Sequence, residues 1–152
     1  YHQEGGALPF VFAGGGLYSE NIQALAETSD KVTYLGTIPP KDATDLIASY
    51  QWALLPIDDE VTKYAFPSKT SSYVVSGASI LSICSDETSV AKWVVENKFG
   101  VNALANVAEL VQTYFLIEKE VIQPAVFNNE IMMTSLGIPG FVKKLNEIIF
   151  RS

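Results

Sequence analysis

The sequence contains a single cysteine, Cys84, and a single histidine, His2. One cysteine excludes a disulfide framework and a cysteine-based metal site within this chain. The only histidine stands at the start of the sequence, which leaves no internal histidine for a Ser-His-Asp arrangement or a histidine ligand set. Cys84 lies in an apolar run, so we expect it to pack as a small hydrophobic side chain in a reducing compartment.

Basic residues are also scarce, with 10 Lys and Arg against 17 Asp and Glu and a net charge of −7. This balance argues against nonspecific nucleic-acid binding and against an anionic membrane surface, since both need basic patches. No apolar run has the length of a membrane span, and the first residues do not form a signal peptide. A length of 152 residues with 48% hydrophobic residues indicates one soluble globular domain.

Short apolar runs alternate with amphipathic segments along the chain. The runs predict strands over residues 8–13, 32–35, 52–56, 79–84 and 99–101. The amphipathic segments predict helices over residues 20–28, 40–50, 67–76, 106–123 and 141–150, and a further helix after residues 85–87 that carries Val90, Trp93 and Val94 at helical spacing. Ser19 is predicted to cap the first helix, and Asn106 with Glu109 to form a capping box. This alternation indicates a parallel sheet with helices on both faces, a Rossmann-like α/β fold.

Pro67 has the fixed φ angle that suits the first position of a helix. The amides of Ser68, Lys69 and Thr70 would then lie in the first turn, where no intrahelical acceptor exists. Free amides, the positive end of the helix dipole and a lysine favour binding of a phosphate or another anion. Gly77 can close this helix in the left-handed conformation. The alternative is an ordinary proline-started helix with a solvated lysine.

Other candidate groups follow the predicted strands, so we expect them to gather at the carboxyl ends of the sheet. The triglycine at 14–16 lacks the full dinucleotide-binding fingerprint, which favours a tight turn over a phosphate loop. Asp58, Asp59 and Glu60 can hold sugar hydroxyls or a cation, although a solvated acidic loop is the commoner arrangement. Ser72 and Tyr73 lie one turn beyond Lys69 and can face the same ligand, while Tyr73 can equally belong to the core.

The order of these motifs resembles the C-terminal half of a GT-B glycosyltransferase. The motifs are FVFAGGG at 10–16, VTYLGTI at 32–38, FPSK at 66–69 followed by Tyr73 and Gly77, and FGV at 99–101. They are most similar to the large retaining family four, whose members build bacterial surface polysaccharides and glycoconjugates. The resemblance implies a hexosyl-transferring enzyme in which this half binds a nucleotide diphosphate sugar, with a UDP-linked sugar expected.

The resemblance also implies a site and its partners. Gly36 and Ile38 would flank the base, and Lys69 would stabilise the departing diphosphate without a metal or another cofactor. A glycan, lipid-linked or protein-linked acceptor would bind an N-terminal half. The resemblance implies a cytoplasmic protein, whose N-terminal half could also contact the inner face of the membrane. The implied donor-binding residues are Gly15, Gly36, Ile38, Tyr64, Pro67, Ser68, Lys69, Thr70, Ser72 and Tyr73.

The sequence departs from the family pattern at two positions. The family often carries two glutamates eight residues apart, and here Tyr64 and Ser72 stand in those places. Glu60 or Asp59 would have to supply the missing carboxylate, which makes Glu60 a second candidate catalytic residue. The departures leave two alternatives open: a catalytically degenerate GT-B domain that serves as a binding or assembly partner, and a flavodoxin-like ligand-binding domain.

The resemblance further predicts that residues 1–152 are one donor-binding domain that lacks its first strand. In a sheet of order 3-2-1-4-5-6, strand 1 is central, so its absence would leave both of its neighbours with unpaired edges. We expect roughly 150 to 200 further residues upstream, including an acceptor-binding domain. Residues 126–152 are expected to form a C-terminal helical segment.

Overall fold

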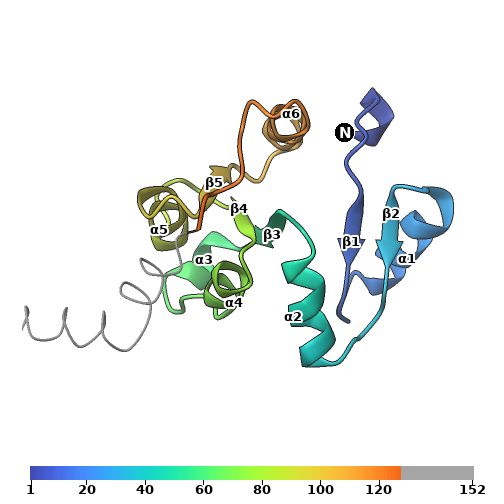
Figure 1. The fold of residues 1–152 in the computed structure, drawn as a ribbon, viewed down its shortest axis with the longest axis horizontal. Helices are drawn as coiled ribbons and strands as arrows, with labels where there is room; N and C mark the ends of the chain where they lie inside the picture. Colours follow the sequence, from blue (N-terminus) through green and yellow to red (C-terminus); the bar gives the residue numbers. More distant parts are fainter. Residues whose placement is uncertain (128–152) are drawn as a thin grey trace, which may run out of the picture.

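The computed structural model describes residues 1–127 and shows an α/β protein with parallel strands (Figure 1). The strands are β1 (Phe10–Phe12), β2 (Val32–Tyr34), β3 (Trp52–Pro56), β4 (Ser79–Ile83) and β5 (Gly100–Ala103). The helices are α1 (Ser19–Thr28), α2 (Pro40–Ala48), α3 (Asp59–Thr62), α4 (Lys69–Val75), α5 (Ser89–Glu96) and α6 (Val107–Glu118), preceded by a short 3₁₀ helix, His2–Glu4. All five predicted strands are present, and the predicted Rossmann-like α/β class is confirmed.

The strands form two separate sheets. β1 pairs with β2, and β3, β4 and β5 form a second sheet in that order, with every pairing parallel. In Figure 1 the two sheets lie side by side, with β3 and β1 as the neighbouring strands. Within residues 1–127, β1 and β3 therefore each have one paired edge and one unpaired edge.

The core is built around β4, all five residues of which are buried. Ile80 points to one face of the sheet and packs with buried side chains of α4 and α5, such as Val74 and Val94. Leu81 points to the opposite face, where it packs with partly buried α6 residues that include Tyr114. Both faces of β4 are covered by other elements. Its sequence is accordingly apolar apart from two small serines and does not alternate between apolar and polar residues.

The two-stranded sheet is joined to the rest of the protein through α6. The Tyr114 ring lies 5.1 Å from the Phe10 ring of β1, and Tyr114 also packs against the cluster formed by β3, β4 and β5. The Tyr1 hydroxyl donates to Glu118 at 2.7 Å, and the Ala7 amide donates to the same carboxylate at 2.9 Å. These contacts fix the position of β1 relative to the larger sheet.

The structure corrects several predicted helix ends. Ser19 is the first residue of α1 rather than its cap, because its hydroxyl bonds back to Gly16. The helix predicted to start at Pro67 begins at Lys69, since Ser68 takes the cap position. Asn106 caps α6 as predicted, but that helix ends at Glu118, well before Pro124, because Glu120 adopts a positive φ of 56°.

Two further predictions concern particular segments. The acidic segment predicted as a loop after β3 forms the short helix α3, because the Asp58 side chain accepts a hydrogen bond from the Glu60 amide at 2.8 Å. Gly77 follows α4 with a φ of 80°, which confirms its predicted left-handed conformation. The helix predicted over residues 141–150 lies outside the described residues.

Candidate functional site

The turns after β1 and β2 lie against each other. The Gly14 amide donates to the Gly36 carbonyl at 2.7 Å, and the Tyr34 hydroxyl donates to the Gly14 carbonyl at 2.8 Å. Gly14 and Gly36 have φ angles of 126° and 62°, which other residues rarely adopt. The predicted site residues Gly15 and Gly36 are therefore brought together at the carboxyl end of the smaller sheet.

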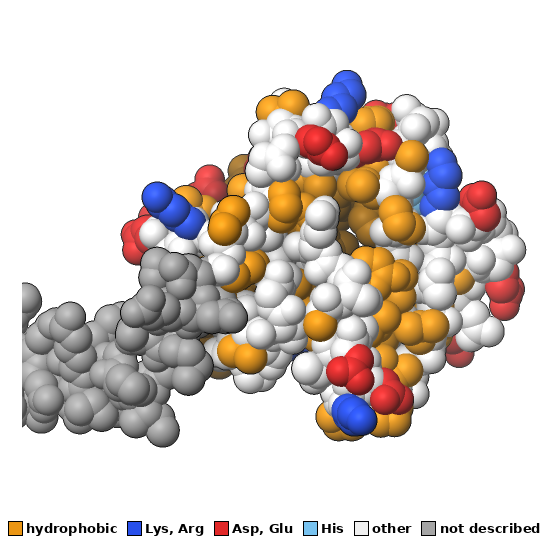
Figure 2. Space-filling model, in the orientation of Figure 1, with side chains coloured by type: hydrophobic (Ala, Val, Ile, Leu, Met, Phe, Trp, Pro, Cys, Tyr) orange, Lys and Arg blue, Asp and Glu red, His pale blue; other side chains and the backbone are white. Residues whose placement is uncertain are grey.

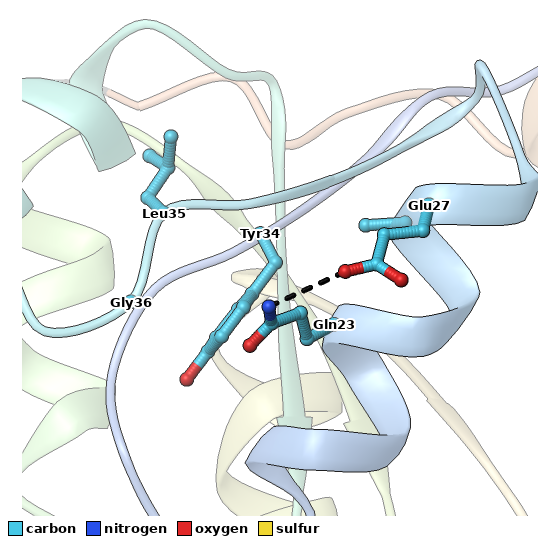
Figure 3. Close-up of a pocket in the computed structure, with 6 residues that line it drawn as sticks. Gln23, Glu27, Tyr34, Leu35 and Gly36 are labelled. Carbon is cyan, nitrogen blue, oxygen red and sulfur yellow. Dashed lines mark hydrogen bonds between the residues drawn. The ribbon is translucent and has the colours of Figure 1, made fainter.

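A shallow hollow lies beside these turns, between α1 and the end of β2 (Figure 3). It has a volume of about 480 Å³ and is lined by Gln23, Ala26, Glu27, Tyr34, Leu35 and Gly36. Gln23 and Glu27 hydrogen bond to each other at 3.3 Å on the α1 side. No lysine or arginine lines the hollow, and Glu27 brings a carboxylate, so the lining offers no cation that could pair with a phosphate. Gln23 and Glu27 were not among the predicted site residues, because they come close to Gly36 only through the packing of α1 against β2.

The start of α4 exposes the residues that the sequence singled out. Ser68 caps the helix without a side-chain hydrogen bond, and both Ser68 and Lys69 are exposed. Within residues 1–127 their amides have no acceptor, and Lys69 forms no ion pair. Thr70 differs, because it is buried and both its amide and its hydroxyl donate to the Pro67 carbonyl, at 3.2 and 2.6 Å. Thr70 therefore holds the turn that presents Ser68 and Lys69.

The side chains further along α4 face different surroundings. Ser72 is exposed, whereas Tyr73 is half-buried and packs against the cluster around Ile80. Burial raises the pKa of the Tyr73 phenol, so its hydroxyl stays protonated at neutral pH. Tyr64 precedes α4 and is 88% exposed. The structure thus places Tyr73 with the core and leaves Tyr64 and Ser72 at the surface.

The acidic side chains of α3 already form an ion pair and a hydrogen bond within the protein. Glu60 forms an exposed ion pair with Lys63 at 2.6 Å. Asp59 accepts a hydrogen bond from the Ser85 amide at 2.9 Å, which ties the segment after β3 to the loop after β4. Among residues 1–127, no three His, Cys, Asp or Glu side chains form a group that could hold a metal ion.

A polar network at the end of β4 was not predicted. The Asn102 side chain bonds to Ser82 and Asp86, each at 2.7 Å, and donates to the Cys84 carbonyl at 3.0 Å. Cys84 itself is buried as predicted, and burial raises the pKa of its thiol. The network holds the loop between β4 and α5, and the raised pKa keeps the buried Cys84 thiol in its protonated, less nucleophilic form at neutral pH.

The predicted site residues thus form two groups at the carboxyl ends of the strands. One group contains Gly15 and Gly36, with the half-buried Ile38 leading into α2. The other contains Pro67, Ser68, Lys69 and Ser72 on α4 and the segment before it. Helix α2 packs against α4 and so connects the two groups.

No protein-family model matches this chain, and no curated protein or solved structure matches it significantly. No helix in the part of the chain that the structure describes is long and apolar enough to cross a membrane.

Proposed function

We propose that residues 1–152 are the donor-binding half of a GT-B glycosyltransferase that uses a nucleotide diphosphate sugar, with a UDP-sugar preferred. The observation that carries this proposal is the grouping of the strands into β2-β1 and β3-β4-β5. A sheet of order 3-2-1-4-5-6 gives this grouping when strand 1 is missing. In the flavodoxin-like order 2-1-3-4-5, by contrast, β1 and β3 would be hydrogen-bonded neighbours.

The start of α4 supports a role for Lys69 in this function. The segment follows β3, at the carboxyl end of the larger sheet, where ligands of open α/β folds bind. Lys69 is exposed and unpaired within the described residues, beside two amides without acceptors. In the proposed mechanism, the lysine and these amides stabilise the negative charge that develops on the leaving diphosphate. The anomeric carbon would lie between this half and an acceptor-binding half.

A second candidate is a GT-B domain that binds a partner or nucleotide without transferring sugar. Two surface positions favour it, because Tyr64 and Ser72 stand where the family often has glutamates. Glu60, the candidate replacement, is already paired with Lys63. A protein that binds UDP yet leaves UDP-sugars intact over long incubation with acceptor extracts would fit this candidate.

The proposed function is tested by calorimetric titration of the full-length protein with UDP, GDP and their sugars. We expect Lys69→Ala to weaken UDP binding by roughly tenfold or more, because a charge-assisted hydrogen bond is worth about 1.5–3 kcal/mol. Lys92→Ala is the matched control, since Lys92 lies on α5 and pairs with Glu87 at 2.9 Å. If no nucleotide binds, or if both variants bind equally well, the donor-site proposal is wrong.

A further inference from the structure

We propose that the hollow between α1 and the end of β2 binds the side chain of an arginine that a partner polypeptide presents. The inference rests on the side chains that line this hollow and does not depend on the proposed function. The volume of the hollow, about 480 Å³, lies within the range of about 300–1,000 Å³ that is typical of ligand pockets.

The aromatic wall of the hollow is Tyr34, at the end of β2. The Tyr34 hydroxyl donates to the Gly14 carbonyl at 2.8 Å, and the residue is half-buried, so the ring is held in one orientation. The ring lies beside the α1 side chains that complete the lining (Figure 3). A planar guanidinium group stacks on an aromatic ring of this kind and is attracted by its negative face.

The polar side chains of the hollow offer mainly hydrogen-bond acceptors. The Gln23 amide nitrogen donates to Glu27 Oε1 at 3.3 Å, and within residues 1–127 the Gln23 carbonyl oxygen and Glu27 Oε2 form no hydrogen bond. Figure 3 shows both side chains extending from α1 on the same side of the hollow. A guanidinium group has several N–H donors in one plane and no acceptor, so it matches this set of acceptors.

The electrostatics of the hollow also favour a cation. Glu27 forms no ion pair within the described residues, and Lys31, which follows α1, instead donates to the Gly6 carbonyl at 3.2 Å. Figure 2 shows more acidic than basic side chains at the edge of the molecule where α1 lies, and the whole chain carries a net charge of −7. This field attracts positive groups. Because a single exposed ion pair contributes little, the site depends on the ring, the acceptors and the carboxylate acting on one group.

An arginine within a polypeptide fits this lining better than free arginine or a lysine. Free arginine carries an α-carboxylate, which finds no cation in the lining and is repelled by Glu27. A peptide bond removes that charge. Ala26 and Leu35, the latter 43% exposed, offer apolar surface to the aliphatic stem of the side chain. A lysine has such a stem but ends in a point charge that cannot stack as a plane.

The proposal is tested by NMR titration of the full chain with capped peptides, acetyl-Gly-X-Gly-amide, in which X is arginine, citrulline or lysine. Citrulline has nearly the shape of arginine without its charge. We expect the arginine peptide to bind in the millimolar range and to shift the backbone amide signals of Leu35 and Gly36. The citrulline peptide, the lysine peptide and free arginine should each bind at least about fivefold more weakly, because each lacks one of the matching features.

Two variants of α1 separate the hollow from a general effect of charge. Glu27→Gln removes the carboxylate and keeps the shape of the side chain, so it should weaken binding of the arginine peptide at least about fivefold. Glu20→Gln is the matched control, because Glu20 lies in the first turn of α1 and does not line the hollow. It should change the affinity by less than about twofold. Lys69→Ala, which tests the proposed function, should leave peptide binding unchanged, so the two proposals can fail separately.

Several results would overturn the arginine site. One is that the arginine peptide leaves the Leu35 and Gly36 amide signals in place. Another is that the citrulline peptide, the lysine peptide or free arginine binds as tightly as the arginine peptide. Equal effects of Glu27→Gln and Glu20→Gln would overturn it as well, since the attraction would then come from the charge of the whole chain.

Discussion

Replacement of Gly100 by alanine should be among the most damaging single changes in this protein. Gly100 lies opposite Ile80 in the β4–β5 ladder. A Cβ atom at position 100 would lie 1.9 Å from the Ile80 carbonyl oxygen and 2.7 Å from the Ile80 nitrogen. Ile80 is fully buried, so its backbone cannot move away without disturbing the centre of the core.

The size of the effect follows from the geometry. An ordinary C···O contact is about 3.3–3.6 Å, so β5 would have to move by more than about 1 Å. That shift would break the bond from the Ile80 amide to the Phe99 carbonyl, now 2.9 Å long, and would loosen the buried Phe99 ring. Two buried backbone groups left without partners, together with lost packing, cost about 3–5 kcal/mol. This is a large part of the about 5–15 kcal/mol that stabilises a typical domain.

Urea unfolding, monitored by circular dichroism, measures the change in the free energy of unfolding. Alanine substitutions at two other glycines serve as controls. Gly16→Ala should change the free energy of unfolding by less than about 0.5 kcal/mol, because its Cβ would meet no atom within 4 Å. Gly77→Ala should cost about 1–2 kcal/mol from the φ of 80° alone, since its surroundings are also open. A loss below about 1 kcal/mol for Gly100→Ala would refute the steric argument.

Two further predictions concern burial and capping. Burial raises the pKa of the Tyr114 phenol above its usual value of 10.0. As the pH rises, the phenol therefore loses its proton in the unfolded chain before it does so in the folded chain. The free energy of unfolding should consequently fall as the pH rises above about 10. Tyr114→Phe should reduce that loss in thermal melts taken between about pH 9 and 11, and an unchanged slope would contradict it. Thr88 caps α5 by accepting from the Ala91 amide at 3.1 Å, so Thr88→Ala should cost about 1–2 kcal/mol in urea unfolding. Thr88→Ser should retain most of this stability, and equal losses in the two variants would rule out the capping role.

Local patterns predicted elements well where one interaction decides the outcome. The run before Cys84, apolar apart from two small serines, became the fully buried β4, because a run without regular polar alternation suits a strand covered on both faces. Gly77 took its left-handed conformation and Asn106 its capping position for similarly local reasons. The predictions failed where neighbouring groups compete. Ser19 bonds to Gly16 instead of capping α1, and Asp58 turns an expected loop into a short helix.

At the candidate site too, local features were predicted from the sequence, whereas contacts between distant residues were not. Lys69 and Ser68 were found from the sequence because a helix start is a local feature, and both are exposed in the structure. The engagement of Asp59 with the Ser85 amide was not foreseen, since the two residues are far apart in sequence. The placement of Gln23 and Glu27 beside Gly36 also depends on how α1 packs against β2.

The sequence by itself determined the α/β class, the number of strands in the described region and the position of the exposed start of α4. These features depend on residue periodicity and on backbone preferences that act over a few residues. Only the tertiary structure decided that Tyr73 packs with the core, that β1 pairs with β2, and that β3 pairs with β4. Strand pairing and burial join residues that are distant in the chain, so no local pattern fixes which strands become neighbours.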